Sequence, residues 1–335
     1  MLQIDFINVG DGDAVLAREY RKGRLAFTLL VDCGRPEVNP LEGSRRLSAA
    51  QYLREQGVAA IDLMAITHLH LDHFGGIPLL AGIPVRRLIA GYLPGESLPA
   101  IQERPVPGGN PSIAGLYTSL DIWTESVRRL RCLGCAVETA ACDRTLPLTR
   151  RLRMRITCPD GGIINRQIEA FSAIAAGRCL PESTLYTVSK ERNNSSLRIL
   201  LEYAGRRILL PGDAYGAFWE QEQDAAPCDI LKLPHHGDEK SLTQRLLRRL
   251  RPRYAVISGL MGALDKHRPA RSTVRLLRRE GTRIASLENE AIEGLRAQSH
   301  RAAVFILRES GRFRRRAGMQ TPGYSGNKRK EGFTR

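Results

Sequence analysis

The stretch Thr67-His68-Leu69-His70-Leu71-Asp72-His73-Phe74-Gly75-Gly76 places four potential metal ligands within six residues, from 68 to 73. Three of the seven histidines of the chain lie there. Residues 61–66, directly before it, form a short apolar run that predicts a buried strand, and the glycine pair after it predicts a turn into a helix. The ligands are therefore expected on a loop at the end of a strand.

The spacing of these ligands suits two metal ions. In extended backbone, residues two apart point the same way, so His68 and His70 can converge on one ion while the turn brings Asp72 and His73 to a second. Imidazole and carboxylate groups are ligands that suit Zn²⁺, Mn²⁺ or iron. The alternative is a solvated loop whose histidines cap a helix. The density of ligands directly behind a buried strand favours the metal site.

The pattern His-x-His-x-Asp-His resembles the signature of the metallo-β-lactamase superfamily of binuclear metal hydrolases. The resemblance implies an aspartate that bridges the two ions after a later strand, and Asp213 stands in that position. It also implies a histidine after the following strand, where the sequence has His235 and His236. We expect His236 to complete the second metal site, and His235 to bind the phosphate or to protonate the leaving oxygen. The opposite order of these two histidines stays open.

Further segments resemble one branch of this superfamily, which contains the soluble hydrolase domain of bacterial competence-type DNA-uptake proteins. The similarity runs in order from about residue 2 to about residue 308. It rests on residues 6–14, 193–197, 234–237, 258–259 and 267–269. Many superfamily members have another histidine shortly before the strand that leads to the bridging aspartate. Here residues 192–196 read Arg-Asn-Asn-Ser-Ser. Asn193, Asn194 or water could fill this position, and oxygen ligation favours Mn²⁺ over Zn²⁺; the alternative is that these residues only begin a strand.

Two aspartates near the expected metal edge have two interpretations each. Asp13 follows Gly10-Asp11-Gly12, and Asp32 precedes Cys33-Gly34. Either carboxylate could orient a ligand histidine from behind. Turn chemistry explains them equally well.

The resemblance and the alternation of predicted strands and helices give the expected fold class, α/β, as a metallo-β-lactamase αββα four-layer sandwich. Residues 1–310 are expected to form one hydrolase domain, with loop insertions at about 94–119 and 159–190, and residues 311–335 a basic flexible tail. Helices are predicted at 44–56, 120–133, 214–223, 241–250 and 272–279. Cys132 and Cys135 could form one arm of a zinc site, but a helix end is the preferred interpretation, because a second pair is lacking.

Composition bears on partners and location. The formal net charge of +16 indicates a polyanionic partner such as nucleic acid or a nucleotide. Only seven of the 51 basic residues are lysine, so arginine bias from a GC-rich genome is an alternative source of the charge. No apolar run approaches the roughly 18 residues that span a bilayer, and scattered cysteines fit a reducing compartment. We therefore expect a cytoplasmic protein without a membrane span; a protein partner is conceivable, and the sequence does not predict an oligomeric state.

These features together predict a metal-dependent phosphodiesterase, a nuclease that uses two divalent ions, Zn²⁺ or Mn²⁺, to activate water for cleavage of DNA or RNA. The expected metal ligands are His68, His70, Asp72, His73, Asp213 and His236. The expected catalytic residues are Asp72, His235 and His267; for His267 a place in open water is an equal alternative. Two alternative functions stay open. The protein could hydrolyse a small phosphodiester such as a cyclic nucleotide, or it could be a partner-binding effector subunit of a bacterial defence system. Lactam hydrolysis is disfavoured, because the chain lacks an export signal.

Overall fold

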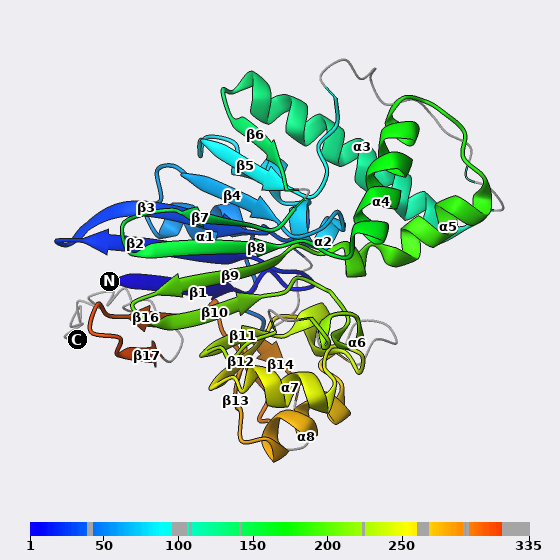
Figure 1. Cartoon of the computed structure of the whole chain (residues 1–335). Coiled ribbons are helices and arrows are strands. Elements are labelled where there is room, and N and C mark those ends of the chain that lie inside the picture. Colours follow the sequence, from blue (N-terminus) through cyan, green and yellow to red (C-terminus); the bar gives the residue numbers. More distant parts are fainter. Residues whose placement is uncertain are drawn as a thin grey trace, which may run out of the picture.

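The structure is a computed structural model, and it describes residues 1–38, 43–95, 106, 109–140, 142–222, 225–259, 268–290, 292 and 295–316. Two large sheets pack face to face, and helices cover their outer faces (Figure 1). Figure 1 shows α3, α4 and α5 on one side of the molecule and α6, α7 and α8 on the other. The predicted αββα sandwich is confirmed.

The first sheet has the strand order β17-β16-β1-β2-β3-β4-β5-β6. Strands β3 to β6 run parallel to one another, and the remaining neighbours are antiparallel. Its strands are β1 (Leu2–Ile7), β2 (Val15–Arg21), β3 (Arg24–Val31), β4 (Leu63–Ile66), β5 (Arg87–Ala90), β6 (Ala136–Thr139), β16 (Ala302–Leu307) and β17 (Phe313–Arg316).

The second sheet has the order β13-β12-β11-β10-β9-β8-β7, in which β10 to β13 are parallel. Because β10, β11 and β12 are parallel, their carboxyl ends lie at the same edge of the sheet. Its strands are β7 (Arg144–Pro147), β8 (Leu152–Thr157), β9 (Arg198–Tyr203), β10 (Arg206–Leu210), β11 (Ile230–Lys232), β12 (Tyr254–Ile257) and β13 (Arg283–Ser286). A small ribbon pairs β14 (Glu288–Asn289) with β15 (Gln298–Ser299).

Helices connect many of these strands. The α-helices are α1 (Ala49–Glu55), α2 (Leu71–Phe74), α3 (Pro111–Cys132), α4 (Gly161–Ala175), α5 (Glu182–Glu191), α6 (Gly216–Trp219), α7 (Gln244–Leu250) and α8 (Arg271–Arg279). Short 3-10 turns are η1 (Ile77–Leu80), η3 (Asn193–Ser195) and η4 (Pro234–Gly237). Among the described residues, no helix is both long enough and apolar enough to cross a membrane.

The core divides into three layers because strand residues alternate between faces. Ile208 and Ile230 point between the sheets, whereas Leu209 and Leu231 point outward against α7 and α8. A third layer lies between the first sheet and α1, α2, α3, α4 and α5, with Trp123 of α3 fully buried in it. Trp123 packs edge-to-face on Phe74, the residue that follows His73, with ring centroids 5.2 Å apart. The ligand loop therefore packs on buried apolar side chains.

Three predictions about irregular segments were wrong. Residues 111–119 form the first turns of α3, where Asn110 accepts a hydrogen bond from the Ser112 amide as an N-cap. The expected loop at 159–190 contains α4 and α5, and it begins with an equivalent cap, Asp160 on the Gly162 amide. Residues 313–316, expected in a flexible tail, form strand β17 at the edge of the first sheet. Residues 317–335 lie outside the described residues.

Candidate metal centre

The predicted ligands converge at one edge of both sheets. β4 leads into His68, His70 and α2, β10 leads into Asp213, and β11 leads into His236. Figure 1 shows α2 at the right-hand edge of the sheets, where strand ends of both meet. All six predicted metal ligands are thus brought together from segments up to 168 residues apart in sequence, between positions 68 and 236.

Among the described residues, the ligand atoms form three groups in which all atoms lie within 4.8 Å of one another. The first group is His68, His70 and Asp213, and the second is Asp72, His73, Asp213 and His236. Asp213 is common to both groups. The third group, Asp13, Asp32 and His73, lies behind the second. The arrangement has the form of two adjacent cation sites that share one carboxylate.

His73 and His236 each use one ring nitrogen to fix the direction of the other. His73 Nδ1 lies 2.8 Å from Asp32 Oδ2, and His236 Nδ1 lies 3.1 Å from the Ser258 carbonyl oxygen. Because a carbonyl oxygen and a carboxylate accept hydrogen bonds, both Nδ1 atoms carry a proton. Each Nε2 lone pair then faces the aspartates, with His73 Nε2 3.3 Å and His236 Nε2 3.6 Å from Asp213 Oδ2. This is the usual arrangement behind a metal-binding histidine.

The first group has different contacts. His68 Nε2 lies 2.9 Å from His70 Nδ1 and 3.9 Å from Asp213 Oδ2. On its other side, His68 Nδ1 lies 3.2 Å from the Thr67 hydroxyl. Of the two asparagines expected to supply an oxygen ligand, Asn194 uses its Oδ1 to accept the Tyr215 amide. Asn193 Nδ2 faces Tyr215 and His235, and Asn193 Oδ1 is buried without a hydrogen-bond partner.

Burial and charge act in opposite directions on the pKa values of these side chains. Burial lowers the pKa of His68 far below its ordinary value and, with Arg192, lowers the pKa of His70 to about 3, so both imidazoles stay neutral. Burial also opposes charge on His236, but the carboxylates of Asp213 and Asp13 outweigh it and raise the pKa of His236 to about 9. The Asp213 pKa is held well below its usual range, since His73 and His236 outweigh the effect of burial. The paired carboxylates therefore favour positive charge in the second group, as protons or as a metal ion.

Asp13 and Asp32, which the sequence left undecided, both support ligand histidines. Asp32 accepts the Thr67 amide and hydroxyl at 2.8 Å each, besides its contact with His73. Asp13 lies 3.4 Å from His236 Nδ1 and forms close contacts with the Ser258 hydroxyl and the ammonium of Lys232. Lys232 is a buried residue that sequence reasoning missed. Its signal was a lysine inside the apolar strand β11, where an unpaired charge would be costly.

The turn at His235 and His236 separates the roles of these two histidines. Both have left-handed backbone conformations, with φ of 45° and 57°. As a result their rings diverge: His236 faces the ligand group, while His235 Nε2 faces Arg268 at 2.6 Å and His235 Nδ1 lies 2.6 Å from Asp238 Oδ2. His267, the other predicted catalytic residue, lies outside the described residues.

Glycine is required at the strand end that delivers Asp213. Gly212 has φ of 57°, and a Cβ there would lie 2.8 Å from the Cβ of Ser196 and 3.0 Å from that of Thr67. This close approach brings the loops after β4 and β10 together. A side chain at position 212 would push Asp213 away from the histidines.

The residues present fit divalent metal ions. His73 Nε2 and Asp213 Oδ1 are buried atoms without a hydrogen-bond partner, and both belong to residues of the shared cluster. Buried polar atoms rarely stay unpaired, and nitrogen and oxygen donors at this spacing suit Zn²⁺, Mn²⁺ or iron. The cysteines do not contribute: Cys132 is exposed at the end of α3, Cys135 is buried, and neither belongs to a ligand group of the described residues.

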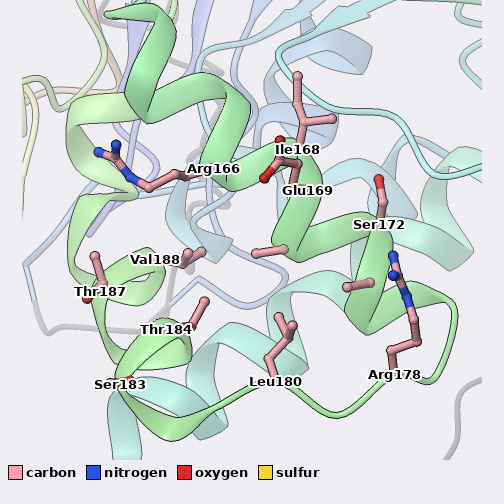
Figure 2. Close-up of a pocket in the computed structure, with 12 residues that line it drawn as sticks. Arg166, Ile168, Glu169, Ser172, Arg178, Leu180, Ser183, Thr184, Thr187 and Val188 are labelled. Atoms are coloured by element: carbon pink, nitrogen blue, oxygen red, sulfur yellow. The ribbon is translucent and has the colours of Figure 1, made fainter.

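A cavity of about 750 Å³ lies apart from the ligand cluster, between α4 and α5 (Figure 2). Figure 2 shows Arg166 and Arg178 at opposite sides of it, with the apolar side chains of Leu180 and Val188 between. Of the predicted site residues that the structure describes, none lines this cavity.

Comparison with known proteins agrees with this location. Residues 11–103, which include the ligand loop, match the family described as the metallo-beta-lactamase superfamily. The chain is 22% identical over 298 residues to ComE operon protein 3 of Bacillus subtilis (strain 168), covering 84% of this chain and 31% of that protein. The chain thus spans about a third of the length of this curated relative.

Two solved structures show distant similarity. One is CmlA, a diiron β-hydroxylase from Streptomyces venezuelae, with a TM-score of 0.45 and 17% identity over 85% of this chain and 52% of that chain. The other is Zn²⁺-bound PqqB from Methylobacterium extorquens, with a TM-score of 0.42 and 12% identity over 85% of this chain and 98% of that chain.

Proposed function

The chain carries a domain of the metallo-β-lactamase superfamily of metal-dependent hydrolases, and on this premise we propose that it is a binuclear phosphodiesterase that cleaves DNA or RNA. The observation that carries the proposal is the position of Asp213 in two adjacent ligand groups. Two divalent ions, Zn²⁺ or Mn²⁺, would supply Lewis acidity and would lower the pKa of water at the site. His68, His70 and Asp213 would hold one ion, and Asp72, His73, Asp213 and His236 the other.

The residues of the chain prepare this site before substrate arrives. Asp32 and the Ser258 carbonyl fix the tautomers of His73 and His236, so that lone pairs rather than N–H groups face the cluster. Lys232 neutralises Asp13, which reduces the repulsion among the buried carboxylates. Asp72 is the more exposed of the two cluster carboxylates, at 14% of its side-chain surface against 2% for Asp213. We therefore assign Asp72 to the side of the cluster that substrate approaches.

The choice of a polymeric substrate rests on charge. The net charge of +16 is large for 335 residues, and phosphates attract such a chain through counterion release. Part of the basic surface is already paired, since Arg128 and Arg248 form ion pairs with Glu125 and Glu280. A small phosphodiester is the second candidate, and the burial of the ligand side chains favours it. A partner-binding effector subunit stays a third hypothesis, which an intact ligand set disfavours.

The test is a substrate panel with metal-loaded protein. Purified chain with Mn²⁺ or Zn²⁺ is incubated with single-stranded DNA, duplex DNA, RNA and cyclic nucleotides, beside Asp72→Ala and Asp213→Ala. We expect cleavage of at least one polymer by the parent and loss of about 10³-fold or more in both variants, as for removal of a group central to catalysis. Cleavage of the cyclic nucleotides alone would select the small substrate. Activity that survives both substitutions would refute the site.

A further inference from the structure

A second polar cluster lies beside the ligand groups and is formed by Asn193, Tyr215, His235, Asp238 and Arg268; we call it the Arg268 cluster. Its residues are attached to the same segments as the ligands: Tyr215 follows Asp213 by two positions, and His235 precedes His236. The ring centroids of His235 and His236 are 6.1 Å apart. A group bound at this cluster would therefore lie next to the metal site.

The central contact of the cluster runs from Arg268 to His235. Arg268 Nη2 lies 2.6 Å from His235 Nε2. Because a guanidinium can only donate, His235 Nε2 is the acceptor and the ring proton sits on Nδ1, which lies 2.6 Å from Asp238 Oδ2. Both ring nitrogens of His235 therefore face side chains of the protein, although His235 Nδ1 makes no hydrogen bond of regular geometry. This geometry suits a histidine that aims Arg268 better than one that protonates a leaving group.

Arg268 is held in place by backbone contacts on its C-terminal side. The Ala270 amide donates to the Gly237 carbonyl at 2.8 Å, and the Thr273 hydroxyl donates to the Asp238 carbonyl at 2.8 Å. A Cβ on Gly237 would lie 3.1 Å from Pro269 Cβ, so the two segments are in close contact. The start of α8 is therefore fixed against the turn that carries His235 and His236.

Two more groups of the cluster suit an anion. The Tyr215 hydroxyl accepts a hydrogen bond from Asn193 Nδ2 at 3.1 Å, which leaves its own O–H as a donor. The ammonium of Lys240 lies 5.9 Å from the centre of the Tyr215 ring, so a second positive charge stands close by. A guanidinium has five N–H donors in a planar fork that matches phosphate oxygens, and the contact with His235 uses one of them.

We propose that Arg268 and Tyr215 form an anion subsite that holds a non-bridging oxygen of the substrate phosphodiester, with His235 and Asp238 as positioning residues for Arg268. This proposal rests on the proposed phosphodiesterase function and adds a group that recognises the phosphate independently of the metal ions. It assigns His235 a role in positioning rather than in proton transfer. It also places substrate specificity partly in Arg268, outside the ligand motif.

The experiment measures phosphate binding and catalysis separately. Titration calorimetry with inorganic phosphate is performed on Mn²⁺-loaded parent, Arg268→Gln, and Arg271→Gln, which removes the same charge from an exposed position three residues away. We expect Arg268→Gln to raise the phosphate dissociation constant about 10- to 100-fold, the size of a lost charged hydrogen bond, and Arg271→Gln to change it less than about twofold. Mn²⁺ stoichiometry should be unchanged in both variants.

Kinetics with bis(p-nitrophenyl) phosphate test the positioning residues. Arg268→Gln should raise KM about tenfold or more, and Arg268→Lys should restore only part of the loss, because a lysine keeps the charge without the fork. Asp238→Asn should raise KM in the parent but add little to Arg268→Gln, since both act through the same guanidinium. If Arg268→Gln does not fold, as judged by its thermal midpoint, Tyr215→Phe removes a single oxygen and should still weaken phosphate binding about tenfold.

The outcomes separate this subsite from the proposed function. If the parent cleaves diesters and Arg268→Gln binds phosphate as tightly as Arg271→Gln, the subsite is overturned and the phosphodiesterase stands. If the parent cleaves no diester yet binds phosphate through Arg268, the subsite stands and the proposed function fails. If Asp238→Asn raises KM by the same factor in the parent and in Arg268→Gln, the positioning role of Asp238 and His235 is overturned.

Discussion

Replacement of Asp32 by asparagine should weaken metal binding by reversing one tautomer. Asp32 Oδ1 accepts the Thr67 amide, and Oδ2 lies 2.8 Å from His73 Nδ1. In Asp32→Asn the amide oxygen keeps the Thr67 bond, so the amide NH₂ takes the place of Oδ2 and faces His73. His73 Nδ1 must then accept a hydrogen bond, and the ring proton moves to Nε2, which points at the ligand cluster. A protonated Nε2 cannot bind a metal ion.

The expected size of this effect follows from the kind of contact that is lost. Groups that orient metal-binding histidines contribute about 10- to 100-fold to metal affinity, which corresponds to roughly 1.4 to 2.7 kcal/mol. Asparagine is close to aspartate in size and tolerates the left-handed backbone of position 32, where φ is 55°, so we expect the fold to be kept. Isothermal titration with Mn²⁺ and Zn²⁺ gives the affinity and the number of ions bound.

Asp62→Asn is the matched control. Asp62 accepts the Thr28 amide at 2.8 Å in the same sheet, but its side chain contacts Arg86 rather than a ligand histidine. Asp62→Asn should bind both ions as the parent does. Equal affinity and stoichiometry in Asp32→Asn and the parent would refute the proposed support of His73.

Three further predictions concern stability. Chelation with EDTA should lower the thermal midpoint of the parent, because ions that bind only the folded state stabilise it by about 2.7 kcal/mol at 100 times their Kd. The thermal midpoint of Asp213→Ala should fall less on chelation, and an equal fall in both proteins would contradict the shared site. Trp123→Ala should reduce the free energy of unfolding by about 3 to 5 kcal/mol in urea titrations. Leu133 is 73% exposed, so Leu133→Ala should change this free energy by less than about 0.5 kcal/mol. Similar losses in the two variants would contradict the packing of α3. Burial opposes the charge of Glu288, but hydrogen bonds from Arg46, Asn8 and Ser44 outweigh it and lower the pKa of Glu288 below 4.5. The stabilising effect of this carboxylate is therefore present above pH 4.5 and is lost as pH falls through the lowered pKa. In urea titrations the difference in unfolding free energy between the parent and Glu288→Gln should shrink over that range, and a constant difference would show that this carboxylate is not the cause.

The sequence indicated which ligand side chains meet at the sheet edge, because four of the six lie within residues 68–73. His68 to His73 follow a strand whose apolar residues are unambiguous, and the apolar runs before Asp213 and His236 identify two more strand ends. Alternating burial then explains the two sheets and the helices that cover them.

Local signals misled the prediction of irregular segments. The Pro- and Gly-rich residues before α3 hid its first turns. The lack of clear periodicity in residues 159–190 hid α4, a helix that the Asp160 cap and buried residues such as Phe171 support. At β17 the arginines suggested a solvated tail. Pairing with β16 and the packing of Phe313 near Tyr254 stabilise a strand there, at ring centroids 5.9 Å apart.

The sequence by itself determined which residue types could bind metal and which strands deliver them. Only the tertiary structure decided which side chains face one another: it turned His236 toward Asp213 and His235 toward Arg268, and it placed Asp32 behind His73. The physical reason is that ligand direction depends on backbone dihedrals and on contacts between distant segments. Two left-handed residues in succession, and the approach of Gly212 to Ser196, are properties of the packed molecule that no local pattern of residues encodes.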